Sequence, residues 1–597
     1  MTFDAPGTSP SIVYPLPGGG DIPAFPPGAA GTPGGSTAAA AAVETVNAAE
    51  AVEAAGEEDP TKAPLFSRIF YEKGASVNRM VATHLGWDAW DASLGRQVNA
   101  HLWSNPTVED LMRSLDPAFE AAGSPPAMDA MLPWLQRPGF PVVTLVVKQE
   151  QQGGAVVATL HASQAPISPF LPPARAAEPW WIPLRVSCDG GAPFLFEFNT
   201  TIASMAVPMK RSEGSGADNG RTANTTMTCV GDPQFRGFFS VRYAQDSQWA
   251  ARIAGAAASL TSTPDYTRAL AFHTFIMATM AHEPASIPAR LLTALAPALA
   301  QNKRLGGYAG SGDLYTMLLT RAAPVTAVLD AGGATSAAAA GEFRAAVRAL
   351  VGPLANWLGW EEEVETEKTR MAAVTGPEPT TPWPQHEDAG VEARAHTSVR
   401  PMALLRAVLS DDTATVASAL VQFRAHYAGP AARATYFAAA RYGQASDKAA
   451  LRTMLTDAVS AGKPYADLLF GLSAGAGDAA GCAAGLAAVS TSTSAAGAGA
   501  AVAALTDVLQ HAPACRAAAW AYFEAAAGQY WKADGAAATS AITKAFAWLV
   551  TAPELASAAS LLATQNATVA SAATRHTALT QIKININMVA NNAGERQ

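Results

Sequence analysis

Apolar positions along this chain recur with two different periods, which divide it into a helical start, a β-rich middle and a long helical remainder. The first helix is predicted from five positions at helical spacing, closed by a glycine: Val77, Met80, Val81, His84, Leu85 and Gly86. Two more helices are expected before Trp134, one of them opened by a capping box of Thr107 and Asp110. Order is expected to begin near Leu65.

The period becomes that of strands after Trp134. The cluster Arg137–Pro141 breaks helices, and the β-branched run Val142–Val147 is typical of a buried strand. Three further strands are predicted between Gly- and Pro-containing turns, at Val156–Leu160, Trp180–Ser187 and Phe194–Phe198. Together these segments predict a small β-sandwich of about 100 residues.

Beyond Tyr243 the helical period returns and continues to the C-terminus. The segments are about 12–18 residues long and rich in Ala and Leu on one face, which favours an α-solenoid of stacked helix pairs. Two stretches interrupt the pattern, Thr375–Ser398 with its Pro and acidic residues and the Gly/Ala/Ser tract Gly471–Gly499. Both are predicted to be loops or insertions.

Composition sets the size and class of the protein. With 597 residues the chain should form three or four domains, and 49% hydrophobic against 15% charged residues gives ample material for their cores. Residues 1–40 contain eight Pro and eight Gly, which predicts a flexible tail. A net charge of -9 argues against nucleic acid or an anionic membrane as partner, because both require a basic face. Peptide partners stay open.

Four cysteines and the N-terminal sequence bear on localisation. Cys188, Cys229, Cys482 and Cys515 form no C-x-x-C pair, which favours a reducing compartment. We expect no signal peptide, because no basic region is followed by an apolar one, and no stretch approaches the roughly 20 apolar residues of a membrane helix. A cytoplasmic protein is the resulting expectation.

One segment carries a specific resemblance. Phe66–Val77, with Tyr71-Glu72-Lys73-Gly74-Ala75 at its centre, is similar to the Tyr-x-Lys-Gly-Ala helix of the aminopeptidase N and puromycin-sensitive aminopeptidase family, which are zinc enzymes of the gluzincin class. In that family the tyrosine donates a hydrogen bond to the oxyanion formed at the scissile carbonyl. The resemblance therefore assigns oxyanion stabilisation to Tyr71, conditional on a zinc site.

Other segments resemble the same family in the same order. They are Asn105–Leu111, Trp134–Val143, Gln234–Tyr243, Trp357–Glu361 and Gln581–Asn587, and the resemblance extends from about Pro64 to Asn591. Composition, periodicity and this resemblance together predict a mainly α protein with four parts: a disordered tail (1–62), C-terminal helices of a thermolysin-like catalytic domain (63–139), a β-sandwich (140–240) and a solenoid of HEAT-like helix pairs (241–597). The first helices, 71–85 and 111–115, would then leave apolar faces open, and poor solubility is expected.

The zinc motif of that family is missing from this sequence. A gluzincin centre requires H-E-x-x-H on a helix, but none of the ten histidines has another four residues away, and the closest pair is His273 and His282. The Gly-x-Met-Glu-Asn segment that grips the substrate amine is also absent. The resemblance implies release of N-terminal residues from peptides with zinc, yet this chain is expected to bind no zinc and to be inactive alone.

Three interpretations follow from the sequence. The first is the C-terminal, peptide-binding portion of an aminopeptidase whose metal-binding half was lost, is a separate chain, or is missing from an incomplete gene model. The second is a non-catalytic peptide-binding or scaffold protein, so whether the chain is an enzyme stays open. The third is an unrelated hydrolase, because Gly471–Gly475 fits the pattern G-x-S-x-G around Ser473 and His511 follows it. Arg242, Arg268 and Arg304 are cations that could meet a peptide.

Overall fold

The computed structural model describes residues 73–593 with internal gaps. The gaps are 137–138, 153–154, 168–178, 208–226, 261–263, 302–311, 361–384, 462, 464, 476–481, 484–485, 488–504, 507, 513–514, 534–544 and 564–571. The predicted tail, residues 1–62, lies outside the described residues. The described chain falls into two compact units, 73–255 and 256–593.

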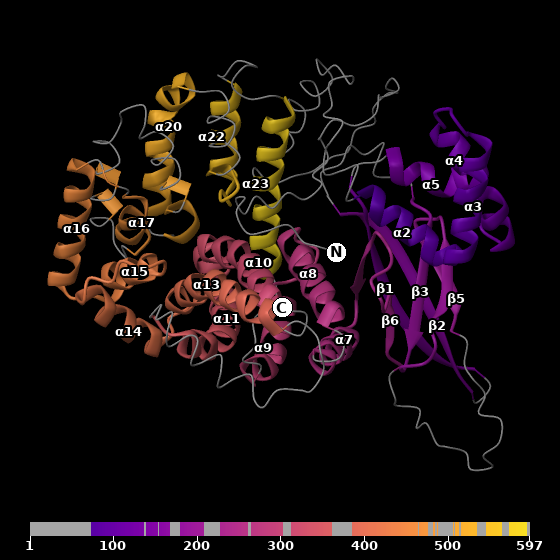
Figure 1. The fold of residues 1–597 in the computed structure, drawn as a ribbon, viewed down its shortest axis with the longest axis horizontal. Helices are drawn as coiled ribbons and strands as arrows, with labels where there is room; N and C mark the ends of the chain where they lie inside the picture. Colours follow the sequence, from indigo (N-terminus) through magenta and orange to yellow (C-terminus); the bar gives the residue numbers. More distant parts are fainter. Residues whose placement is uncertain are drawn as a thin grey trace, which may run out of the picture. The chain divides into compact units, whose positions relative to one another are not determined.

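The first unit contains four helices, then seven strands, then most of a fifth helix (Figure 1). These are α2 (Gly74–Leu85), α3 (Trp87–Ala100), α4 (Val108–Ala121), α5 (Ala127–Gln136), β1 (Pro141–Gln152), β2 (Ala155–Pro166), β3 (Ile182–Cys188), β4 (Phe194–Phe198), β5 (Ile202–Ala206), β6 (Cys229–Gly231), β7 (Ser240–Tyr243) and α7 (Asp246–Ser259). Helix α2 ends at Gly86, whose φ is 88°, as the sequence predicts. The capping box of Thr107 and Asp110 at the start of α4 is also confirmed.

The strands form two sheets. One has the order β5-β2-β1-β7 and the other β4-β3-β6. Strands β1 and β2 pair antiparallel along their whole length, whereas β7 joins β1 in parallel at Val142↔Ser240 through Leu145↔Tyr243. The four predicted strands correspond to β1, β2, β3 and β4, although β3 begins two residues later than predicted, at Ile182. Strands β5, β6 and β7 are additional. The β-sandwich itself stays a prediction.

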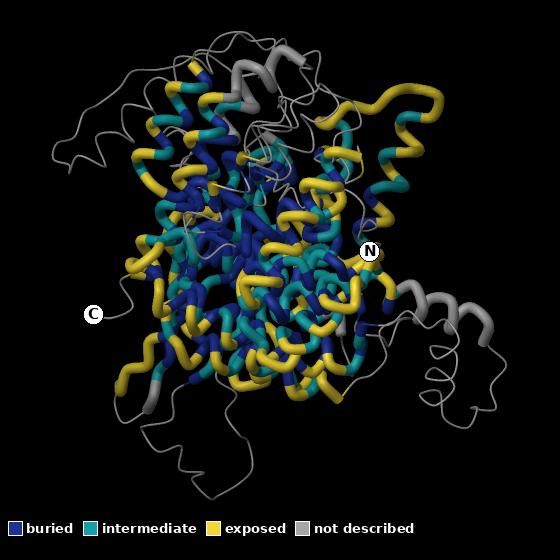
Figure 2. The backbone as a smooth tube through the Cα atoms, turned by 90° about the vertical axis from the view of Figure 1, so that its left-hand side faces the viewer, coloured by how far each residue is buried: buried dark blue, intermediate teal, exposed yellow. Residues whose placement is uncertain are grey.

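All described elements of the second unit are helical, as expected beyond Tyr243. They are α8 (Pro264–Thr279), α9 (Ser286–Gln301), α10 (Gly312–Ala331), η3 (Gly333–Thr335), α11 (Ala337–Leu358), α13 (Gln385–Leu409), α14 (Thr413–Arg424), α15 (Ala432–Tyr442), α16 (Ala445–Ser460), α17 (Ala466–Gly475), α20 (Arg516–Ala533), α22 (Ala552–Ala563) and α23 (Ala572–Ala593). Helix α9 packs on α11, and α15 on α17. Figure 2 shows the buried turns of such helices in dark blue. No helix in this described part is both long and apolar enough to cross a bilayer.

Two predicted loops are partly helical. Residues 385–398, which fall in the predicted loop Thr375–Ser398, belong to α13, because the prolines of that predicted loop end at Pro384 and mostly helix-forming residues follow. The helix also contains Pro401, beyond the predicted loop. Residues 471–475 of the predicted tract Gly471–Gly499 are the last five of α17, where their burial outweighs the low helix propensity of glycine. The remainder of each stretch lies wholly or largely outside the described residues.

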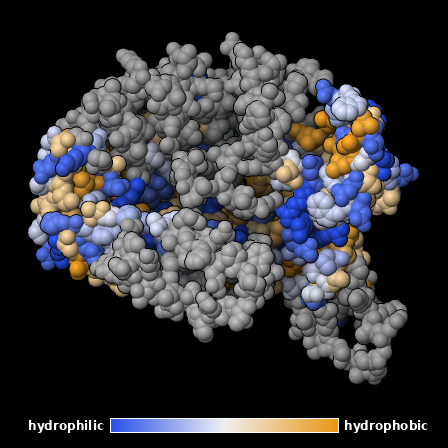
Figure 3. Space-filling model, viewed as in Figure 1, coloured by the Kyte–Doolittle hydropathy of each residue, from blue (hydrophilic) through white to orange (hydrophobic). Residues whose placement is uncertain are grey.

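The expected open apolar face exists, but on a different helix. Val77 and Met80 on α2 and Met112 and Leu115 on α4 are buried. Helix α3, the segment after it and the first residue of α4 instead expose five large apolar side chains, which we call the α3 face: Trp87, Val98, Leu102, Trp103 and Val108. Figure 3 shows apolar surface gathered over α3–α5. A groove of about 380 Å³ lies between Val98, Leu102, Trp103 and their neighbours.

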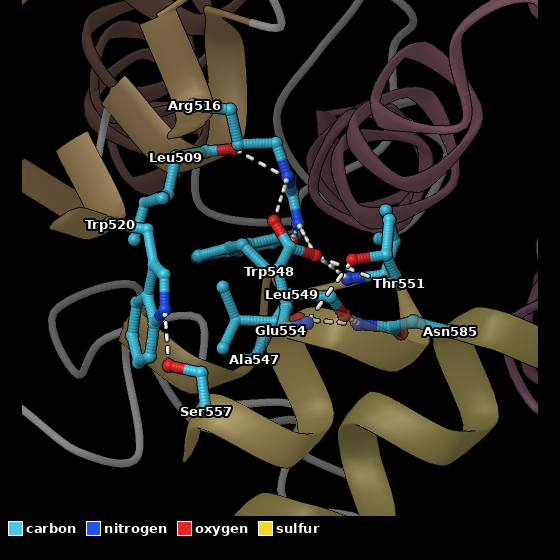
Figure 4. Close-up of polar contacts among 11 residues, drawn as sticks. Leu509, Arg516, Trp520, Ala547, Trp548, Leu549, Thr551, Glu554, Ser557 and Asn585 are labelled. Atoms are coloured by element: carbon cyan, nitrogen blue, oxygen red, sulfur yellow. Dashed lines mark hydrogen bonds and ion pairs between the residues drawn. The ribbon is translucent and has the colours of Figure 1, made fainter. Parts of the chain in front are cut away.

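A buried ion pair ties the last helices together (Figure 4). The guanidinium of Arg516 on α20 meets Glu554 on α22, with Nε to Oε1 at 3.0 Å, and also donates to the carbonyls of Leu509 and Trp548. Glu554 accepts the backbone N–H groups of Val550 and Thr551. These bonds join α20 to α22 through the segment between them.

The four cysteines pair in the structure, as Cys188–Cys229 and Cys482–Cys515. The first disulfide joins β3 to β6 at a register pair of their ladder. The absence of C-x-x-C spacing did not reveal these pairs, because folding brings together cysteines that are 41 and 33 positions apart. A reducing compartment therefore finds no support in the cysteine pairing.

Candidate functional site

Tyr71, the residue to which the sequence assigns a chemical role, lies outside the described residues. The described chain begins at Lys73, and α2 begins at Gly74, three positions after Tyr71. The structure therefore describes how α2 is held in place, but not Tyr71 itself. Val77, Met80, Val81 and Ala82 form its buried face, so α2 is held by packing along its length.

The middle of α2 is anchored to the turn before β7. The backbone N–H of Phe238 donates to Sδ of Met80 at 3.4 Å. That turn is shaped by Asp232, whose carboxylate accepts the N–H groups of Arg236 and Gly237, each at 2.9 Å. Burial raises the pKa of Asp232, and these two N–H groups and the cations Arg252 and Arg79 oppose the rise. Because Arg79 lies on α2, charge also links this helix to the turn.

A buried arginine stabilises the same turn from the other side. Arg252 on α7 donates to the carbonyl of Gly231 at 2.8 Å and to the hydroxyl of Tyr243 at 3.0 Å. Its guanidinium lies 4.4 Å from the ring centroid of Phe235. The segment Gln234–Tyr243, which resembles the aminopeptidase family, is thus built around Asp232 and Arg252.

The end of α2 is anchored to the sheet β4-β3-β6. Arg185 on β3 donates to the carbonyl of Thr83 at 3.2 Å. Nε2 of His84 lies 2.8 Å from Oγ of Ser124, and Ser124 donates to Oε2 of Glu197 on β4 at 2.9 Å. Nε1 of Trp181 holds the other oxygen of Glu197 at 2.9 Å. We call His84, Ser124 and Glu197 the α2 anchor.

The α2 anchor contains the residue types of a hydrolytic triad but not its arrangement. In a triad the histidine lies between the serine and the acid, so that one ring nitrogen takes the serine proton and the other is held by the carboxylate. Here Ser124 lies between His84 and Glu197, and Nδ1 of His84 has no hydrogen-bond partner among the described residues. The cluster holds a helix in place and does not activate a nucleophile.

Ser473 and His511 do not form a hydrolase site either. A nucleophile elbow requires a sharp turn from strand to helix, whereas Ser473 lies inside α17 and is 1% exposed. His511 faces the ring of Phe470 edge-on, with centroids 5.6 Å apart. Burial, with Arg406 and Arg433 nearby, holds its pKa well below the ordinary value. The pattern G-x-S-x-G is the end of a helix.

The described residues do not fit the zinc centre that the family resemblance implies. Zinc in proteins is held by three or four His, Cys, Asp or Glu side chains gathered at one point. The described part of the chain brings no three such residues together in a way that could hold a metal ion. Of the three cations suggested for peptide contact, Arg242 lies on β7, Arg268 lies on α8, and Arg304 is outside the described residues.

Sequence reasoning missed the α2 anchor and the Asp232 turn. Their members are far apart in the chain, as with His84 and Glu197, so no local spacing reveals them. One signal was present, because His84 occupies an apolar position of the helical period, and a histidine there requires a buried partner.

Comparison with known proteins finds relatives for part of the chain. Over 204 residues, 34% of the chain, it is 30% identical to Aminopeptidase M1 of Arabidopsis thaliana, and the match covers 22% of that protein. It is 28% identical over 187 residues to Aminopeptidase M1-B of Oryza sativa, covering 30% of the chain and 18% of the relative. It is 28% identical over 151 residues to Tricorn protease-interacting factor F2 of Thermoplasma acidophilum, covering 25% and 18%. No protein-family model matches the chain. The chain thus spans about a fifth of the length of these curated relatives.

Proposed function

Because part of the chain is related to the M1 aminopeptidases, we propose that it is the peptide-binding, C-terminal portion of such an enzyme. In this proposal the chain supplies Tyr71 and the helices and sheets that place it. The metal centre belongs to a separate zinc-bearing part, on a longer form of the chain or on another polypeptide. The reaction is release of N-terminal residues from peptides, and the chain described here is inactive alone.

The observation that carries the proposal is the Tyr-x-Lys-Gly-Ala segment that leads directly into an anchored helix. A phenol can stabilise a transition state only if its direction is fixed before the reaction, since a mobile donor gains little. Met80 and the α2 anchor hold the middle and the end of α2. The Tyr71 hydroxyl would donate a hydrogen bond to the oxyanion that forms as the scissile carbonyl is attacked.

The first test is an assay of the purified chain on leucyl and alanyl substrates, with and without added zinc. We expect no hydrolysis in either condition. Chelator-sensitive cleavage by the chain alone would overturn the proposal that the metal centre belongs to a separate part. The second test adds a polypeptide that carries the H-E-x-x-H part of an M1 aminopeptidase, and we expect activity to appear only in the mixture.

A variant separates this proposal from the scaffold alternative. Tyr71→Phe removes the hydroxyl and keeps the ring, so it should lower kcat of the mixture by about 10²–10³-fold, as for loss of one oxyanion donor, and leave peptide binding unchanged. Tyr266→Phe, on α8 in the other unit, is the matched control. Peptide binding without activity in any mixture would favour the non-catalytic scaffold.

A further inference from the structure

His84 has an unusual position for a titratable side chain. It lies at the end of α2 with its side chain 2% exposed. Because the hydroxyl of Ser124 donates to Glu197, its oxygen can only accept from His84. The neutral imidazole therefore carries its proton on Nε2. Nδ1 is unprotonated and has no hydrogen-bond partner among the described residues.

The surroundings of His84 are mostly apolar. The ring of Trp181 meets it edge-on with centroids 5.0 Å apart, and Phe119 on α4 lies at 6.3 Å. The charged groups that act on it are Glu197 on β4, whose Oε2 is 3.5 Å from Nε2, and Arg185 on β3. If Nδ1 were protonated, its N–H would be buried without a hydrogen-bond acceptor among the described residues. Leaving a buried donor unpaired costs free energy.

We propose that His84 is a proton-operated latch: the neutral ring holds the end of α2 against β4 through Ser124 and Glu197, and uptake of one proton at Nδ1 releases the helix. The latch stands on the contacts of the α2 anchor alone. Under the proposed function it would also place Tyr71, which lies three positions before α2 in the sequence.

The direction of the pH effect follows from the same contacts. Burial lowers the pKa of His84 below its ordinary value, Glu197 opposes the shift, and Arg185 adds to it. The held state thus favours the neutral ring, while the released state takes up a proton near the ordinary pKa of about 6.5. The latch is fully closed above that pH and weakens as pH falls toward the lower, held-state pKa. Within this window each pH unit multiplies the opening equilibrium by up to about tenfold.

The test is amide hydrogen exchange of α2 in the full chain between pH 5 and 7.5, corrected for the intrinsic pH dependence of exchange. We expect protection of residues 74–85 to fall steeply below about pH 6.5. His84→Gln keeps a donor to Ser124 but does not titrate, so its protection should be independent of pH. His101→Gln is the matched control, because His101 lies past the end of α3 with its side chain 26% exposed, 3.8 Å from Asp110. It should keep the wild-type response.

A second measurement covers the case in which His84→Gln does not fold. Titration of the histidine rings of the wild-type protein by NMR should show His84 protonating below the ordinary range, together with the loss of α2 protection. A pH-independent α2 in the wild type, or an identical pH response in His84→Gln, would overturn the latch. Neither readout requires catalysis, so failure of the proposed function would leave this result intact.

Discussion

At the scale of single residues, breaking the buried pair Arg516–Glu554 should destabilise the C-terminal helices. Arg516→Met leaves Glu554 without its cation and with its side chain only 14% exposed. Breaking one partner of a buried pair costs about 3–5 kcal/mol. We expect a loss of this size in the free energy of unfolding, measured by urea denaturation. The loss should grow at neutral pH relative to pH 4, because Arg516 helps to hold the pKa of Glu554 below its ordinary value against the effect of burial.

A second arginine–carboxylate pair provides the control. Arg424 contacts Asp447 through two hydrogen bonds, but the Arg424 side chain is 48% exposed. Asp447→Asn should therefore have a smaller effect, since the Arg424 side chain that is left behind is largely open to water. Equal losses in the two variants would contradict the importance that we give to burial.

The residue scale also shows what local sequence can reveal. The capping box of Thr107 and Asp110 was predictable, because its partners are three positions apart and bond within one helical turn. The partners Arg516 and Glu554 are 38 positions apart, and His84 and Glu197 are further still. Such pairs depend on how elements pack, and no spacing rule reports that.

At the scale of elements, the strongest strands were predictable and the short ones were not. Strands β1 to β4 contain β-branched or aromatic residues, many of them buried, such as Ile182 and Val186 in β3. Strand β5 reads Ile-Ala-Ser-Met-Ala, and β6 has three residues. These segments have little intrinsic β propensity and exist because a neighbouring strand supplies hydrogen bonds. The parallel pairing of β1 with β7, nearly 100 positions away, is likewise beyond local pattern.

The disulfide Cys188–Cys229 should stabilise the edge strand β6. It closes a loop of 41 positions, and removing such a link costs about 3–4 kcal/mol in the chain-entropy account. The double variant Cys188→Ser/Cys229→Ser should lose that stability in urea denaturation without reductant. Wild-type protein treated with reductant should show the same unfolding free energy as the variant for the unit of residues 73–255. Four reactive thiols in denatured protein purified without reductant would show that neither disulfide forms.

At the scale of the whole molecule, sequence predicted the family relationship and the change from strands to helices, because motifs and periods are local. It did not predict which helix exposes its apolar side. Helices α2 and α4 were expected to have open faces, yet Met112 and Leu115 are buried. Apolar residues at helical spacing mark a buried face, but neighbours in three dimensions decide which faces are covered.

The α3 face makes self-association the expected behaviour of this chain. Trp87, Val98, Leu102, Trp103 and Val108 are each at least half exposed and lie within one stretch of 22 positions. An apolar patch of this kind binds dyes and other exposed apolar surfaces. Leu102→Gln/Trp103→Gln should therefore reduce both light scattering at high concentration and fluorescence of a bound apolar dye, with little change in unfolding free energy.

The control for that experiment is an exposed apolar residue away from the α3 face. Val421 on α14 is 61% exposed, comparable with Leu102, and lies outside that stretch. The matched comparison is with the single variant Leu102→Gln, since Val421→Gln removes a similar amount of exposed apolar surface. Val421→Gln should leave scattering and dye binding near wild type. If both variants reduced scattering equally, total surface hydrophobicity would explain the association. If only the α3 variant reduced scattering and dye binding, the self-association would be located at the α3 face, next to α2.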